Sequence, residues 1–155
     1  MFNIVLFNPQ IPQNTGNIAR TCAVTGSRLH LIKPLGFTID DKSLKRAGLD
    51  YWQDVDVTLH ENFAEFMSTV GGHNVYLLSS KAKKSYVDCE YKDGDYLLFG
   101  SETSGVPEYV HECLRSTEMR VPMVASEHAR CLNLSNTVAL ALYEALRQNS
   151  FLGMK

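Results

Sequence analysis

The sequence lacks the features that mark several large classes of protein. No apolar run approaches the roughly 18 residues that a membrane-spanning helix needs. The first ten residues, MFNIVLFNPQ, have neither a basic segment nor a small-residue cleavage site, so we do not expect a signal peptide. None of the 4 cysteines lies in a CxxC pair, which argues against a zinc or redox site and favours free, buried thiols. We therefore expect a cytoplasmic protein with no membrane segment and no metal.

Several catalytic motifs are also missing. No GxGxxG follows the first expected strand, and GxxxxGK[ST], HExxH and GxSxG do not occur. These absences argue against a dinucleotide fold of the usual kind, a P-loop enzyme, a zinc protease and an α/β-hydrolase. The net charge of −2 argues mildly against a protein that coats nucleic acid through bulk charge, although a local basic patch remains compatible with it.

Short apolar runs alternate with helical patterns along the whole chain. We expect strands at residues 3–7, 29–32, 57–59, 75–79, 96–99 and 120–123. We expect helices from Asn14 or Thr15 to about 24, over 40–48, after a capping-box start at 62–65, from 107, and from about 135 to 149. This alternation predicts an α/β fold, with a mostly parallel sheet and helices on both faces, in a single domain over residues 1–155.

The last expected helix contains TVALALYEAL, which is apolar on nearly every side. Such a helix is expected to be buried all round. A helix at a dimer interface is one solution, and a helix wrapped fully inside one domain is the other.

Three polar clusters follow expected strands or precede expected helices: NTGNIAR, FGSETSG and RCLNLSN. Their chemically useful side chains are Asn14, Arg20, Glu102, Asn133 and Ser135. Arginine suits a phosphate or a developing oxyanion, and a glutamate in a glycine-rich loop can accept hydrogen bonds from a ligand or from loop amides. Helix caps and solvent-facing side chains are the alternative interpretation of each cluster. Because open α/β sheets bind ligands at the carboxyl ends of their strands, three clusters at that edge favour a binding site.

These clusters, in this order and spacing, resemble the SPOUT superfamily of RNA methyltransferases. The resemblance extends over essentially the whole chain, through IPQNTGNIARTCA, KSLKRAGLDYW, DGDYLLFGSETSGVP and RVPM…LNLSNTVALALYEALRQ. It implies S-adenosylmethionine-dependent 2′-O-methylation of the ribose at the wobble nucleotide of tRNA, position 34, a cytidine or modified uridine. It further implies a SPOUT-type trefoil knot near the C-terminus and a homodimer whose active sites lie near its interface.

The resemblance also assigns site residues. The cofactor pocket would be formed by backbone around Leu78, Gly100, Val121 and Cys131, with Leu132 packed nearby. The catalytic group would be Arg20, Asn14, Glu102, Asn133 and Ser135. In this assignment, Arg20 stabilises the 2′-alkoxide, Asn14 holds Arg20 or the ribose, and Glu102 lies near the sulfonium. Asn133 and Ser135 would orient ribose or cofactor.

The chain departs from close relatives at two positions. Ser104 stands where several carry an arginine, which affects the expected RNA affinity or substrate range, and the stretch 128–130 could supply replacement contacts. Cys131 stands where many carry a serine, and its backbone can still serve the adenosine.

Contacts with the tRNA anticodon stem-loop are expected from basic and aromatic side chains. The basic candidates are Lys42, Lys45, Arg46, Lys81, Lys83 and Lys84. Without the resemblance, such clusters are more often solvated surface than phosphate sites. The stacking candidates are Tyr51, Trp52 and Tyr143. Three alternatives stay open: methylation of another RNA such as rRNA, a non-catalytic RNA-binding protein with this fold, and a domain that binds a small nucleotide without RNA.

Overall fold

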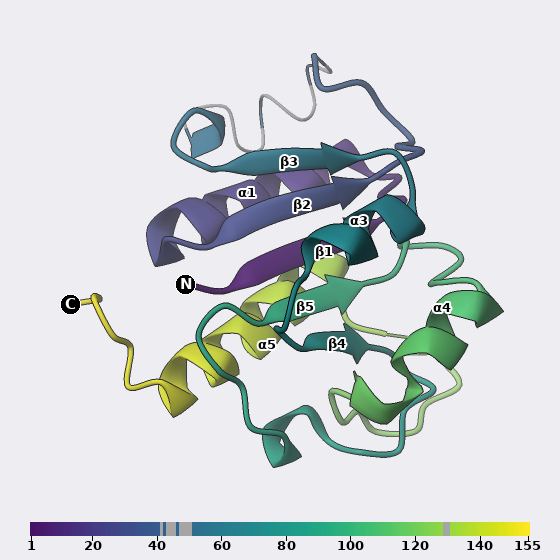
Figure 1. Ribbon diagram of the computed structural model, residues 1–155. Coiled ribbons are helices and arrows are strands. Elements are labelled where there is room, and N and C mark those ends of the chain that lie inside the picture. Colours follow the sequence, from purple (N-terminus) through teal and green to yellow (C-terminus); the bar gives the residue numbers. More distant parts are fainter. Residues whose placement is uncertain (41, 43–45, 47–50, 129–130) are drawn as a thin grey trace.

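The computed structural model describes residues 1–40, 42, 46, 51–128 and 131–155 (Figure 1). Its centre is a 6-stranded sheet in the order β3-β2-β1-β5-β4-β6, in which neighbouring strands run parallel. The strands are β1 (Asn3–Phe7), β2 (Arg28–Ile32), β3 (Val57–His60), β4 (Val75–Leu78), β5 (Tyr96–Phe99) and β6 (Glu118–Met119). The predicted parallel sheet is confirmed, but the last strand ends before the predicted range 120–123 begins.

Four described helices flank this sheet, together with two short 3-10 turns. They are α1 (Pro12–Thr25), α3 (Phe63–Thr69), α4 (Glu108–Leu114) and α5 (Leu134–Gln148), with η1 (Tyr86–Asp88) and η2 (Arg115–Thr117). The helix predicted over 40–48 falls almost wholly outside the described residues. Within the described part of the chain, no helix has the length and apolar character needed to cross a membrane.

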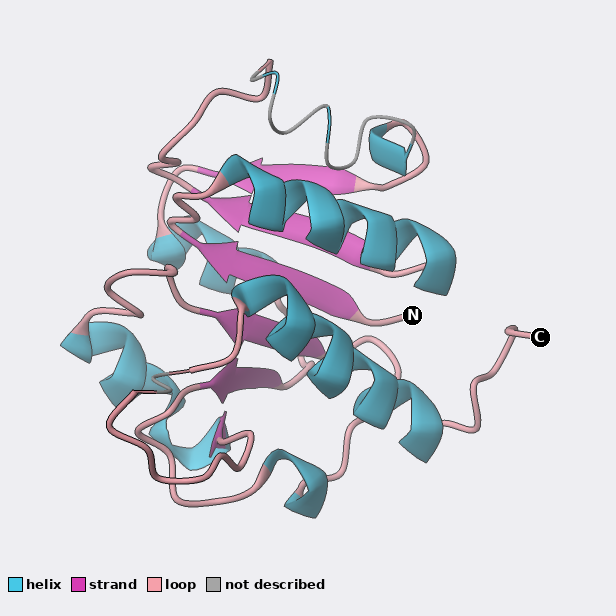
Figure 2. Cartoon of the chain, turned by 180° about the vertical axis from the view of Figure 1, so that it is seen from behind, coloured by secondary structure: helices cyan, strands magenta, loops and turns pink. Residues whose placement is uncertain are grey.

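The helices form one layer on each face of the sheet. In Figure 2, α1 and α5 lie over one face, whereas Figure 1 shows α3 and α4 over the other. Side chains of a strand alternate between the two faces, so Ile4 and Leu6 join the core under α1 and α5, and Val5 and Phe7 join the core under α3 and α4. Burial on both faces explains why the sequences of β1, β2, β4 and β5 are nearly continuous apolar runs.

Helix α1 begins earlier than the sequence suggested. It starts at Pro12, and the capping residue Ile11 offers no side-chain hydrogen bond. The prediction that Asn14 or Thr15 caps this helix is therefore wrong, because proline suits the first helical position and lacks the N–H that a cap would satisfy. The predicted end is confirmed: Gly26 has φ 68°, in the left-handed region that glycine adopts at low cost.

Helix α5 is capped by Asn133, whose Oδ1 accepts a hydrogen bond from the Ser135 amide at 2.9 Å. Its buried residues are Val138, Ala141, Leu142, Ala145 and Leu146. Leu140 and Tyr143 are 43% and 42% exposed, so the prediction of burial all round is wrong for this chain by itself.

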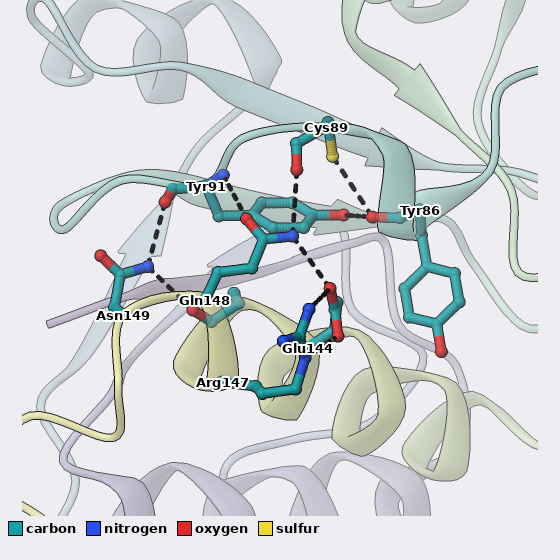
Figure 3. Close-up of polar contacts among 8 residues, drawn as sticks. Tyr86, Cys89, Tyr91, Glu144, Arg147, Gln148 and Asn149 are labelled. Carbon is teal, nitrogen blue, oxygen red and sulfur yellow. Dashed lines mark hydrogen bonds and ion pairs between the residues drawn. The ribbon is translucent and has the colours of Figure 1, made fainter.

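The C-terminal end of α5 is fastened to the segment between β4 and β5 (Figure 3). Gln148 accepts a hydrogen bond from the Tyr91 amide and donates one to the Cys89 carbonyl, both at 3.0 Å. The Tyr91 hydroxyl donates to the Tyr86 carbonyl at 2.6 Å, and burial raises the pKa of Tyr91, so this phenol stays a neutral donor. These bonds hold the segment that leads from β4 into β5. The trefoil knot expected in the C-terminal part stays a prediction.

Candidate functional site

A cavity of about 520 Å³ lies at the carboxyl ends of β4 and β5. Its lining comes largely from four strand-following segments and the start of α5, and includes Ile11, Asn14, Ser79, Ser80, Lys81, Gly100, Ser101, Glu102, Ser104, Gly105, Val106, Val121, Met123, Cys131, Leu132, Asn133, Leu134 and Thr137. The strand order turns back between β1 and β5, and open α/β sheets bind their ligands at such a switch point. The size of this cavity is that of an ordinary small-molecule site.

All five residues proposed from the sequence to hold a cofactor line this cavity, namely Leu78, Gly100, Val121, Cys131 and Leu132. They come from the end of β4, the loop after β5, the segment after β6 and the entry to α5. The fold therefore collects residues from distant parts of the sequence around one space.

The loop after β5 is closed on itself. Ser101 and Gly105 exchange two backbone hydrogen bonds, each 3.0 Å long. Gly105 has φ +62°, which a side chain rarely tolerates, and a Cβ at Gly100 would lie 2.6 Å from the carbonyl carbon of Gly105. Both glycines are thus required by the backbone geometry of this loop.

Glu102 projects from this loop towards the segment between β1 and α1. Its carboxylate accepts hydrogen bonds from the amides of Gln10 at 3.0 Å and Ile11 at 2.6 Å. The loop amides that bond to this glutamate therefore belong to the segment between β1 and α1, and not to the loop after β5 that carries Glu102. Since Ile11 caps α1 without a side-chain bond, the carboxylate also supplies a negative charge beside the start of that helix, where the helix dipole favours one.

Asn14 connects the other two polar clusters. Its Nδ2 lies 3.4 Å from Glu102 Oε2, and its Oδ1 accepts a hydrogen bond from Asn133 Nδ2 at 3.1 Å. Asn133 Oδ1 in turn accepts from the Ser135 hydroxyl at 2.5 Å. The four side chains form one polar network, although their sequence separations reach 88 and 119 residues.

Arg20 is not part of this network. It is exposed, does not line the cavity, and its guanidinium lies 5.1 Å from the centre of the Tyr51 ring. Six residues along α1 separate it from Asn14 by about 9 Å of helix axis. Of the two partners expected for Asn14, Arg20 is not in contact with it, because the buried amide of Asn14 is bonded to Glu102 and Asn133. The contact with the ribose stays a prediction.

The sequence interpretation missed part of the cavity wall. Ser79 and Ser80 follow β4 and line it, and so does Lys81, which the sequence had suggested only as a contact for RNA. His111 of α4 also lines it, and its Nδ1 forms a part-buried hydrogen bond of 2.7 Å with Glu118 Oε1. Nothing in the spacing of these two residues had marked them as neighbours of the other clusters.

The expectation of buried cysteines is only partly correct. All four are free, but Cys113 and Cys131 are exposed, whereas Cys22 and Cys89 are buried. Among the residues that the structure describes, no group of three or more histidine, cysteine, aspartate or glutamate side chains is arranged to hold a metal ion.

The parallel sheet and the cavity at its switch point define an α/β protein with a cavity of small-molecule size beside a set of polar loops. A family model described as the SpoU rRNA Methylase family matches residues 1–143. The chain belongs to this family.

Three comparisons give the range of similarity. The tRNA (cytidine(34)-2'-O)-methyltransferase of Saccharophagus degradans is 47% identical over 156 residues, covering 100% of both chains. A solved structure described as "Structural insights into the 2-OH methylation of C/U34 on tRNA" is 45% identical, with a TM-score of 0.92 and 97% of both chains covered. The SpoU methyltransferase AviRb of Streptomyces viridochromogenes, solved in complex with AdoMet, is 24% identical with a TM-score of 0.81 over 96% of this chain and 60% of that one, and it shows likeness of fold alone.

Proposed function

We propose that this chain is a cytoplasmic tRNA methyltransferase. It transfers a methyl group from S-adenosylmethionine to the ribose 2′-oxygen of the wobble nucleotide at position 34, a cytidine or modified uridine. Relatives that match over the full chain carry this activity in their names. The observation that carries the proposal is the network of Asn14, Glu102, Asn133 and Ser135 beside the cavity, because it joins all three motif segments at one place.

The cavity fits a polar cofactor. Ser101 lines it, and the buried Oγ of this residue has no hydrogen-bond partner among the described residues. Gly100 lines the cavity too, and its missing side chain makes room for the backbone of Gly105, which keeps the loop closed beside the cavity. We assign the holding of the cofactor to backbone at Leu78, Gly100, Val121 and Cys131. When bound, S-adenosylmethionine supplies a methyl group on a positively charged sulfur, which the nearby Glu102 carboxylate would favour.

The residues of the network act by position. Asn14 and Asn133 fix each other and line the cavity, so they are placed to orient a ribose there. Arg20 keeps its proton under all ordinary conditions, so its proposed part is to stabilise the forming 2′-alkoxide and not to remove a proton. The 2′-hydroxyl group loses its proton to solvent water as its oxygen bonds to the methyl group, and the rate depends chiefly on holding that oxygen in line with the methyl group.

We further propose that the chain forms one domain and works as a homodimer. Leu140 and Tyr143 on α5, with Leu132 just before it, expose apolar surface that a second copy of the chain would cover. Arg20 does not line the cavity of its own chain. Its proposed part in the transfer therefore requires a contact that a single chain does not supply. Sedimentation of the wild type against a Leu140→Glu variant tests this: wild-type dimers that dissociate in the variant support the homodimer, and a monomeric wild type contradicts it.

The transfer of a tritiated methyl group from S-adenosylmethionine to tRNA lacking this modification tests the activity, followed by nuclease mapping of the labelled nucleotide. Label on the ribose of nucleotide 34 is the expected result. An Arg20→Ala variant that transfers at the wild-type rate would show that the assignment of Arg20 is wrong. Because the family description names rRNA, unmodified rRNA forms a second arm, and label there with none in tRNA would replace the proposed substrate.

A further inference from the structure

A second cavity lies beside the first. It has a volume of about 340 Å³ and is lined by Lys83, Ser85, Arg120, Pro122 and Met123. Met123 lines both cavities, so the second one borders directly on the proposed site of methyl transfer.

The basic side of this cavity is held by backbone bonds. The Arg120 amide donates to the Lys84 carbonyl, and the Tyr86 amide donates to the Arg120 carbonyl, each at 2.8 Å. Ser85 and Arg120 therefore form a parallel bridge that extends the edge of the sheet beyond β6. The basic segment after β4 is thus positioned by the same kind of bonds that hold a strand, which limits the freedom of its side chains.

The charge of this cavity is not neutralised by the protein. Its lining includes two cations and a hydroxyl group but no carboxylate. In the part of the chain that the structure describes, neither Lys83 nor Arg120 forms an ion pair. The buried Nε of Arg120 also has no hydrogen-bond partner there, so the guanidinium is not committed to any acceptor of the protein. A guanidinium without a protein acceptor, beside a lysine and a hydroxyl group, suits an anionic ligand.

We infer that this second cavity binds a backbone phosphate of the substrate RNA, beside the nucleotide that is methylated. The inference rests on the proposed function, since it takes RNA as the substrate. Arginine presents planar donors to phosphate oxygens, lysine adds a point charge, and the Ser85 hydroxyl can donate a further bond. A phosphate held here would fix the register of the RNA strand without reading its sequence, while the ribose lies over the first cavity.

The test compares tRNA binding by the wild type, Lys83→Gln and Arg120→Gln over a series of salt concentrations. Lys83 is exposed, so its substitution leaves folding intact, and thermal melting checks Arg120→Gln. Lys92→Gln is the matched control, because it removes the same charge from an exposed lysine. Lys92 precedes Asp93, whose carboxylate pairs with the amino group of Met1. Each cavity variant should bind tRNA several-fold more weakly, and the slope of log K against log salt should decrease by about 0.7 for each phosphate that is no longer neutralised. The control should keep the wild-type slope.

The affinity for S-adenosylmethionine, measured by calorimetry on the same variants, distinguishes an RNA phosphate in this cavity from the carboxylate of the cofactor. It should stay at the wild-type value. Weaker cofactor binding with an unchanged salt slope would assign the cavity to the carboxylate of the cofactor and overturn the inference. Wild-type values of both the cofactor affinity and the salt slope of tRNA binding would overturn it too. If the wild type itself binds and methylates no tRNA, the proposed function fails, whereas active wild type with unaltered Lys83→Gln and Arg120→Gln variants refutes this inference alone.

Discussion

Replacing Glu102 by glutamine tests whether this carboxylate anchors a neighbouring loop or acts on the cofactor directly. The two carboxylate oxygens accept hydrogen bonds from the amides of Gln10 and Ile11 at 3.0 and 2.6 Å. A glutamine side chain retains only one acceptor oxygen and turns an NH₂ group towards the other amide. The substitution therefore removes one charge-assisted bond and weakens the second.

The expected magnitude follows from these bonds. A hydrogen bond to a charged group contributes about 1.5–3 kcal/mol. If the loop at residues 10–11 must keep its place for the network at Asn14 to align the ribose, that energy appears in the barrier. Since about 1.36 kcal/mol corresponds to a factor of ten in rate, kcat/KM for methyl transfer should fall about 10- to 100-fold.

Hydrogen exchange and single-turnover methyl transfer measure the two effects separately. In Glu102→Gln, the amides of residues 8–14 should exchange faster, and transfer should slow. Glu108→Gln is the matched control, because Glu108 is an exposed glutamate nearby whose surface ion pair with Arg115 contributes little. Unchanged exchange together with lost cofactor affinity would refute the anchoring role and favour a direct contact with the sulfonium. Unchanged exchange and unchanged transfer would refute both roles.

Three further predictions concern the loop, the cap and the core. Gly100→Ala should abolish cofactor binding in calorimetry, because the added Cβ would lie 2.6 Å from backbone, whereas Gly72→Ala meets open space and should bind normally. Asn133→Ala should destabilise the protein in urea titrations by about 1–2 kcal/mol through loss of the α5 cap, and Ser135→Ala by less. Burial lowers the pKa of His30 to about 4, so the folded state holds this imidazole neutral while the unfolded state takes up a proton near pH 6.5. Stability should thus be full above pH 6.5 and fall by about 3 kcal/mol towards pH 4 in urea titrations, and a His30→Gln variant should show a flatter profile.

Strands β1, β2, β4 and β5 were predictable because each is buried on both faces and its sequence is largely an apolar run. Local signals also located the helix ends at Gly26 and Asn62, where a left-handed glycine and a side-chain cap act within a few residues. The last strand was misplaced because β6 consists of only two residues, and its position depends on pairing with Leu77 and Leu78 of β4. Such a pairing is a property of the folded sheet and leaves little trace in the local sequence.

The candidate site was predictable as a set of segments but not as a set of contacts. Resemblance identified residues that line one cavity, including Leu78 and Cys131. It did not predict that Glu102 would bond to the amides of Gln10 and Ile11, because no local pattern links residues about 90 positions apart. The start of α1 could not be predicted from local sequence for the same reason. The carboxylate that bonds there, that of Glu102, comes from the loop after β5 and not from residues beside the helix.

The contacts of Glu102 and His111 restrict how the proposed transfer can work. Each oxygen of Glu102 is engaged by a backbone amide, and Nδ1 of His111 is engaged by Glu118. The two most obvious proton acceptors among the described lining residues are therefore already held in structural bonds. Either residue can take up a proton only at a position that these bonds leave open, namely a second lone pair of a Glu102 oxygen or Nε2 of His111. Alignment of the ribose by Asn14 and Asn133 uses neither Glu102 nor His111 as a base and leaves the network intact throughout the reaction.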